Sequence, residues 1–213
     1  SDHDSQTCPI GPRDRSRLRA QRVGPPHVQG SLAGRLLIAA PAIEDPRFKQ
    51  AVILLCAHNE EHAMGIVVNR IAEGIELPDL LDQLGVDGDL APKHHHVMLG
   101  GPVGRDRGFV LHTEDYDNDG ATLPVCEGVC LTATRDILHA IASDHPPEKF
   151  LLALGYSGWG AGQLEEELAG NVWLVGQPDL ALVFDRSLDT KWARALARIG
   201  VSPDRLQVYG GRA

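Results

Sequence analysis

The sequence predicts a single compact α+β domain, and two features of the chain carry this prediction. Two apolar segments, 51–57 and 64–69, are separated by the short polar stretch 58–62, an arrangement typical of a hairpin of antiparallel strands. Apolar and amphipathic segments alternate irregularly over the rest of the chain, with no internal repeat, which favours a strand-rich α+β order over a parallel α/β fold. A chain of 213 residues, 43% of them hydrophobic, is long enough to bury a core.

Residues 1–30 are predicted to be a disordered leader, and residues 31–213 the folded domain. The leader is rich in Arg, Asp, Pro and Ser and has almost no apolar periodicity. Its five Arg and three Asp give it a net charge of +2, so the domain carries −11 when the whole chain carries −9. Such an acidic domain lacks the basic surface on which affinity for nucleic acid depends, and direct DNA binding is disfavoured. Without a signal peptide or a long apolar segment, the sequence predicts a cytoplasmic protein that does not enter the membrane.

The first half of the domain contains apolar segments that end at proline, glycine or polar residues. We expect strands at 36–40, 51–57, 64–69, 97–99 and 107–112. Asp45 and Pro46 are typical of a helix start, because Asp accepts hydrogen bonds from free backbone N–H groups and Pro fits the first turn. One helical turn is therefore predicted over 45–48, and a short helix over 77–84 that ends at Gly85.

The second half combines short apolar segments with two amphipathic ones. We expect strands at 129–131, 150–154, 172–175 and 180–184. Residues 134–142 place Ile137, Leu138 and Ile141 on one side of a helix. A last helix is predicted over 192–199, with Asp189 or Thr190 as its cap and Gly200 as its end.

Four glycines and an aromatic pair fill residues 155–162, between the strand 150–154 and a helix predicted over 163–168. We expect a turn there at which the backbone passes close to another group, because glycine permits positive φ and close approach. Spacing excludes three motifs: the segment lacks the last glycine of a nucleophile elbow, the lysine of a phosphate-binding loop and the final spacing of a dinucleotide turn. A tight connection with Trp159 as a packing anchor and a binding cleft are the alternatives that remain.

The four cysteines are expected to be reduced thiols, because a cytosolic chain of this size does not depend on disulfides: Cys8, Cys56, Cys126 and Cys130. Along one extended strand, Cys126 and Cys130 would lie about 13 Å apart, too far for a disulfide. Their spacing is not that of a zinc knuckle, and His94, His95 and His96 are interpreted as a solvated loop. No metal and no cofactor are predicted.

Several short motifs occur in a characteristic order along the domain. They are 40–48, Cys56-Ala-His58, 64–69, Gly100-Gly101-Pro102, 107–112, 155–165 and Asn171-Val-Trp173. Together these motifs resemble the AlgH/YqgE family of bacterial proteins over about residues 31–213. The resemblance implies a branched, barrel-like, mostly antiparallel sheet surrounded by helices, and a cytosolic regulator of transcription linked to alginate control, without a known DNA-binding motif.

The resemblance supplies no established catalytic residue. Ser157 occupies a position that is often Ala in the family, which argues against a nucleophile there. Ala57 stands where the family commonly has an acidic residue between Cys56 and His58, which weakens any coordinated chemistry of that motif.

We expect the functional surface to be formed by polar and aromatic residues at strand ends and turns. These residues are Asp45, Arg47, Asn69, Arg107, Tyr156, Trp159, Gln163 and Glu166. Tyr156 and Trp159 are aromatic anchors of the kind that dominates binding surfaces. The main hypothesis is therefore a non-catalytic protein that binds a protein partner or a small ligand.

The alternative hypothesis is an enzyme with a cleft at the 155–162 turn. On an extended strand, Cys56 and His58 share one face about 6–7 Å apart, so the imidazole has the spacing to activate the thiol. A small buried Cys and a loop His are the competing interpretation. Glu165 and Glu166 with Asp45 are a further candidate acid/base set, although carboxylates at a helix start usually only complement the helix dipole.

The C-terminal helix is the one basic helix near the end of the chain. Lys191, Arg194 and Arg198 recur at helical spacing and are interpreted as a solvated face. No helix-turn-helix pattern accompanies them. A regulatory effect is therefore expected to act through a partner, with the Arg-rich leader adding weak electrostatic contact.

Overall fold

A computed structural model describes residues 31–203. Within that range it contains ten strands: β1 (Leu36–Ala39), β2 (Val52–His58), β3 (His62–Val67), β4 (Ile71–Glu76), β5 (His96–Leu99), β6 (Val103–His112), β7 (Thr122–Cys126), β8 (Val129–Thr132), β9 (Phe150–Gly160) and β10 (Trp173–Gly176). Its helices are α2 (Leu77–Gln83), α3 (Asp136–Ile141), α4 (Gln163–Ala169), α5 (Leu180–Phe184) and α6 (Leu188–Arg198). The leader predicted for residues 1–30 lies outside the described residues.

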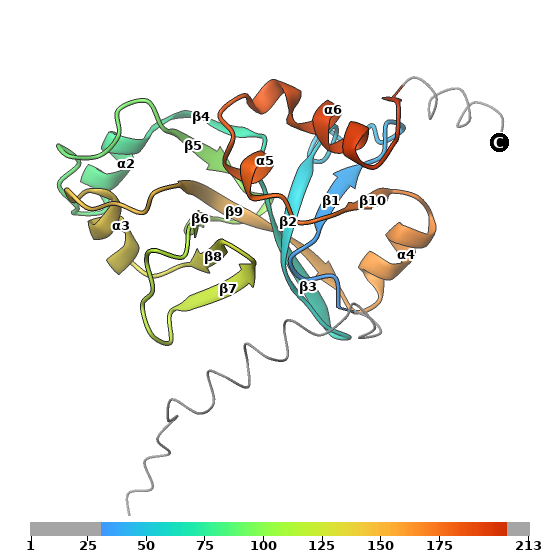
Figure 1. Ribbon diagram of the computed structural model, residues 1–213, viewed down its shortest axis with the longest axis horizontal. Helices are drawn as coiled ribbons and strands as arrows, with labels where there is room; N and C mark the ends of the chain where they lie inside the picture. The colour runs from blue at the N-terminus through green and yellow to red at the C-terminus, as the bar shows by residue number, and fades with distance from the viewer. Residues whose placement is uncertain (1–30, 204–213) are drawn as a thin grey trace, which may run out of the picture. The chain divides into compact units, whose positions relative to one another are not determined.

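The strands form one branched sheet organised around β9. Its main path runs β10-β1-β2-β3-β9-β6-β8-β7, and β4 and β5 form a side branch that also joins β9. All pairs are antiparallel except β5 with β9, which is parallel. β9 crosses the middle of Figure 1, with α5 and α6 above it and α2 and α3 at one end of the sheet. The predicted α+β class, with a branched and mostly antiparallel sheet, is confirmed.

The sequence of strand β1 is apolar without interruption because the strand is covered on both faces. Successive side chains of a strand point to opposite faces, so a strand that is covered on both faces has no polar positions. Leu36 and Ile38 pack in a cluster with residues of α5 and α6, whereas Leu37 packs in a second cluster with Leu164 of α4. A third cluster packs α2 and α3 against β5, β6 and β9. The sheet is therefore buried between helices on both of its faces around β1 and β2.

The turn predicted for residues 155–162 is wrong over most of its length, because β9 continues to Gly160. Gly158 and Gly160 pair with Met64 and His62 of β3, so the glycines belong to the sheet. Gly155 has a φ of +74° and lies against the backbone of Gly101, where a Cβ atom would stand 2.5 Å from a carbonyl oxygen. The glycines thus permit close packing of strands, and the backbone turns only at 161–162.

Other local predictions also need correction. Residues 180–184 form helix α5 instead of a strand, because the Asp179 side chain accepts a hydrogen bond from the Leu182 N–H and caps the helix. Cys126 and Cys130 lie on the two strands of a β7–β8 hairpin and not along one strand. Strands β4 and β7 were not predicted, and α6 begins at Leu188. The single turn predicted over 45–48 is present, because the Lys49 N–H donates to the Asp45 carbonyl at 2.8 Å, the spacing of one helical turn.

Lys191 is not part of a solvated face. Its side chain is fully buried, and Nζ donates hydrogen bonds to the carbonyl oxygens of Val68 at 2.8 Å and of Val183 at 2.7 Å. Burial lowers the pKa of this ammonium group to about 8, although Asp185 partly offsets the effect. No helix among the described residues is both long and apolar enough to cross a membrane.

Candidate functional site

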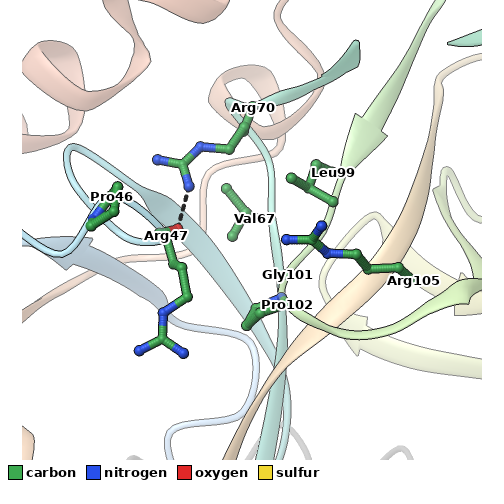
Figure 2. A pocket seen from close by; sticks show the side chains of 8 residues that line it. All are labelled: Pro46, Arg47, Val67, Arg70, Leu99, Gly101, Pro102 and Arg105. Carbon is green, nitrogen blue, oxygen red and sulfur yellow. Dashed lines mark hydrogen bonds between the residues drawn. The ribbon is translucent and has the colours of Figure 1, made fainter. Parts of the chain in front are cut away.

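A cleft with three arginines lies beside the junction of β3, β5 and β6. We call it the arginine cleft, and it is lined by Pro46, Arg47, Val67, Arg70, Leu99, Gly101, Pro102 and Arg105. Its volume is about 360 Å³, within the range of small-molecule sites. Figure 2 shows Arg70 above the cleft, with its guanidinium bonded to the Arg47 carbonyl, and Arg105 entering from the right, with Val67 between the two guanidinium groups. The cleft combines an apolar floor with cationic walls.

Each wall of the cleft comes from the end of a strand or from a turn. Val67 ends β3, Arg70 follows three residues later, and Leu99 ends β5. Arg105 lies in β6, in the part between Val103 and Gly108 where pairing with β9 is interrupted. Such an interruption frees side chains from the regular alternation of a strand and directs them to new positions. The rigid sheet thus presents the arginines at its irregular points.

The floor depends on close packing of the Gly100-Gly101-Pro102 segment against β9. A Cβ atom on Gly101 would stand 2.1 Å from the carbonyl oxygen of Tyr156, and one on Gly100 would stand 2.4 Å from that of Gly155. The Gly100 carbonyl accepts hydrogen bonds from the Val67 N–H at 2.9 Å and from Ser157 Oγ at 3.2 Å. Only glycine fits at these positions, so the motif found in the sequence serves the construction of the cleft.

The 45–50 turn is fastened to the end of β3 by side chains. Asn69 Oδ1 accepts a hydrogen bond from the Val52 N–H at 2.9 Å, and its Nδ2 donates to the Gln50 carbonyl at 2.8 Å. Arg70 donates to the carbonyl oxygens of Arg47 and of Lys49, the latter at 3.1 Å. Asn69 itself does not line the cleft, but it holds together the two segments that do.

The three arginines differ in how their charge is compensated. Arg47 forms an ion pair with Asp45, Nη2 to Oδ2 at 2.7 Å, and its guanidinium points away from the other two in Figure 2. The Arg47 side chain lowers the pKa of Asp45, so the carboxylate stays charged at neutral pH. Arg70 bonds only to neutral carbonyl groups, and Arg105 has no hydrogen bond or ion pair within residues 31–203. Arg70 and Arg105 therefore line the cleft without a bound carboxylate, and the Arg70 guanidinium is turned toward the 45–50 turn.

The residues predicted from the sequence as one surface lie in two regions. Asp45, Arg47 and Asn69 border the arginine cleft or support it. Arg107 and Tyr156 lie next to it, on β6 and β9 respectively, and both contact the Phe109 ring. The guanidinium carbon of Arg107 is 5.5 Å from the centroid of this ring, and the centroids of the Tyr156 and Phe109 rings are 5.6 Å apart. The remaining residues, Trp159, Gln163 and Glu166, are located at α4 or against it.

Trp159 is a core residue and not an exposed anchor. Only 5% of it is exposed, and its Nε1 donates a hydrogen bond to Glu167 Oε1 at 3.2 Å. Trp173 Nε1 donates to the same oxygen at 3.2 Å, so one carboxylate of α4 joins β9 and β10. Gln163 accepts a hydrogen bond from the Gly160 N–H, whereas Glu166 is exposed. This region fastens α4 to the sheet.

Cys56 and His58 do not form an activated pair. Register shifts between Leu55 and Ala57, so the strict alternation assumed for the pair is broken. Cys56 is buried, its Sγ lies 3.4 Å from the Leu54 carbonyl, and burial raises the pKa of its thiol far above neutral pH. His58 Nδ1 accepts a hydrogen bond from the Leu32 N–H, and its Nε2 lies 2.6 Å from Glu165 Oε1. The thiol is held protonated, and the histidine links α4 to β2.

Sequence reasoning missed Arg70 and Arg105, the two arginines of the cleft that form no ion pair with a carboxylate. Each carries a local signal, because Arg70 follows Asn69 at a strand end and Arg105 stands two residues before Arg107. What the sequence does not show is that β3, β5 and β6 all pair with β9, which brings the two arginines to one cleft. Among the described residues, no group of three or more His, Cys, Asp or Glu side chains is placed to hold a metal ion.

Comparison with known proteins places these features in context. A sequence model of the family described as AlgH-like matches residues 36–204. A "UPF0301 protein" of Caulobacter vibrioides is 54% identical over 183 residues, covering 85% of this chain and 94% of the relative. A further "UPF0301 protein", from Rhodospirillum rubrum, is 49% identical over 185 residues, with 87% and 96% covered.

Two solved structures share the fold. The solution structure of the AlgH protein from Pseudomonas aeruginosa has a TM-score of 0.66 and 42% identity, and the match covers 81% of this chain and 91% of that protein. The crystal structure of a protein from Corynebacterium diphtheriae has a TM-score of 0.63 at 19% identity, with 83% and 90% covered. The second match supports the fold alone.

Proposed function

This chain belongs to the AlgH-like family, and we propose that it is a non-catalytic protein that binds a small anionic ligand in its arginine cleft. The observation that carries the proposal is the charge of the cleft. None of its eight lining residues is acidic, and the neighbouring carboxylate of Asp45 forms its ion pair with Arg47, although its charge also acts on Arg70. A chain of net charge −9 therefore concentrates positive charge in one hollow. Guanidinium groups that face a partly desolvated hollow are well suited to carboxylates and phosphates.

The proposal includes the regulatory role that the family resemblance implies. We place the protein in the cytoplasm, where the ligand signals through a protein partner instead of through direct contact with DNA. The overall acidity supports this indirect route, because nucleic-acid affinity depends on basic contacts with phosphates. Arg194 and Arg198 of α6 are paired with Asp185 and Asp179 respectively, which leaves that helix with little free positive charge.

The structure gives less support to an enzyme. The nucleophile candidate Cys56 is buried with a raised pKa, and thiolate character is what makes a cysteine reactive. The segment proposed as a catalytic cleft, 155–162, is mostly a paired strand. A binding role for the arginine cleft requires neither feature.

Thermal denaturation of the full chain with and without small anions tests the proposal. A panel of small carboxylates and phosphates, with neutral and cationic molecules as a counter-set, should contain anions that raise the Tm. A ligand at 100 times its Kd stabilises by about 2.7 kcal/mol, which corresponds to several degrees. Arg105→Glu should abolish the shift, and Arg107→Glu, a neighbouring arginine that does not line the cleft, should keep it. No shift with any anion, or equal loss in both variants, contradicts the proposal.

A further inference from the structure

The arginine cleft has a charge that distinguishes between classes of anion. Arg47 and Asp45 cancel, while Arg70 and Arg105 carry one positive charge each without a bound carboxylate. The cleft and its one adjacent ion pair therefore have a net charge of +2. The next two residues of β6, Asp106 and Arg107, do not line the cleft. A ligand that neutralises the cleft must carry two negative charges.

The placement of the two arginines favours one compact dianionic group. They line the same hollow, Arg70 from above and Arg105 from the right in Figure 2, with the Val67 side chain between the two guanidinium groups. A single carboxylate carries one charge and satisfies one guanidinium fork. A phosphate monoester carries about −1.5 to −2 at neutral pH and has three strong acceptor oxygens, enough to accept from the Arg105 fork and from the N–H groups that Arg70 does not donate to the 45–50 turn.

The apolar floor of the cleft imposes a second requirement on the ligand, namely an apolar part that covers it. Leu99, Pro46 and Pro102 present apolar surface, and inorganic phosphate leaves most of it uncovered. The Val67 side chain is already buried by the protein, whereas the prolines and Leu99 are partly accessible. An organic group attached to the phosphate covers this surface and gains free energy from its removal from water. A cavity of about 360 Å³ has room for both parts.

Resting on the proposed function of the cleft, we infer that its ligand is a phosphate monoester of a small, partly apolar alcohol. Arg70 and Arg105 hold the dianionic phosphate, and the apolar floor takes the organic group. Recognition depends on side-chain guanidinium groups, since none of the lining residues belongs to a helix and no helix N-terminus is part of the cleft.

Isothermal titration of the full chain with three phenyl-bearing anions, and with inorganic phosphate as a fourth probe, tests this inference. Phenyl phosphate is a dianion at pH 7.5, phenyl sulfate is a monoanion of nearly equal size, and benzoate is a monoanionic carboxylate. Phenyl phosphate should bind at least tenfold more tightly than either monoanion, and also more tightly than inorganic phosphate. The ratio of phenyl phosphate to phenyl sulfate affinity should fall toward one at pH 5, because the second pKa of a phosphate monoester is near 6.

Variants show which side chains provide the discrimination. Arg105→Gln should lower phenyl phosphate affinity at least tenfold and reduce the preference over phenyl sulfate, while Arg107→Gln should leave both unchanged. Equal binding of phenyl phosphate and phenyl sulfate at pH 7.5 would overturn the phosphate inference and leave an anion site in place. Equal binding of phenyl phosphate and inorganic phosphate would overturn the role of the apolar floor. Failure of every probe to bind would overturn the proposed function together with the inference.

Discussion

The Nζ atom of Lys191 lies 2.8 Å from the carbonyl oxygen of Val68, one residue from the floor of the arginine cleft and two from Arg70. This contact joins helix α6 to the end of β3 from inside the core. The same segment holds the 45–50 turn through Asn69 on its other side. The cleft is therefore supported by a buried cation that a substitution can remove without touching the lining residues.

Lys191 should make stability depend on pH in the alkaline range. Its pKa is about 8 in the folded protein and 10.5 when unperturbed, so the unfolded chain binds the proton more tightly. The cost of burying the charge is fully present below pH 8, and it is relieved as pH rises toward 10.5. The shift corresponds to roughly 3 kcal/mol. Urea denaturation at pH 7 to 10 should show the free energy of unfolding of the wild type rising relative to Lys191→Met. A difference that is independent of pH would contradict this.

Glu167 should be a strong stabilising residue of α4. Its Oε1 accepts hydrogen bonds from the indoles of Trp159 and Trp173, and Glu167→Ala leaves two largely buried N–H groups without an acceptor. The expected loss is about 1–3 kcal/mol in the free energy of unfolding. Denaturation followed by tryptophan fluorescence measures it. Glu166→Ala, on the exposed side of the same helix, serves as the control and should change stability by less than about 0.5 kcal/mol. Equal losses of stability in the two variants would argue against a stabilising role for the two indole hydrogen bonds of Glu167.

Gly101 should not tolerate a side chain. A Cβ atom there would lie 2.1 Å from the Tyr156 backbone, so Gly101→Ala must push the 100–102 segment away from β9. The expected cost is about 1–3 kcal/mol, with weaker ligand binding because the segment forms part of the cleft. Gly108→Ala is the matched control on the same sheet, since its Cβ would meet only Leu152 Cδ1 at 3.8 Å. Chemical denaturation of both variants decides the matter, and a Gly101→Ala protein as stable as Gly108→Ala would refute the packing argument.

Cys56 should react slowly with iodoacetamide at neutral pH. Burial keeps its thiol protonated and shielded, because its pKa is raised by desolvation. Mass spectrometry of the alkylated chain should find Cys56 modified much more slowly in the folded protein than in urea. Rapid modification of the folded protein at this position would restore the enzyme hypothesis.

The sequence was sufficient where burial is decided locally. Strands β1 and β2 are continuous apolar segments because helices cover both of their faces, and the boundaries of α2 and α4 follow from their glycine ends. A short apolar segment such as 180–184 is compatible with strand or helix, and the Asp179 cap decides in favour of α5. The glycines of β9 predicted a turn at 155–162 because the sequence does not show which strands pack against them.

The candidate site was only half predictable for the same reason. Asp45, Arg47 and Asn69 stand at strand ends and turns and were identified as functional candidates. Lys191 was wrongly assigned to a solvated face, because helical spacing alone does not show that its ammonium group donates to two carbonyl groups in the core. Arg70 and Arg105 are 35 residues apart in sequence, and the pairing of β3 and β6 with β9 brings them to one hollow.

The most direct measurement is a titration of the ¹⁵N-labelled full chain with phenyl phosphate, followed by amide chemical shifts. A ligand in the arginine cleft should shift the amides of Val67, Arg70, Gly101 and Arg105 in a saturable manner. The amides of α4 should stay in place, because that helix lies outside the cleft. Saturable shifts confined to those four positions and their neighbours are the predicted result. No shifts, or shifts centred on α4 or another surface, would contradict the assignment of the cleft as the binding site.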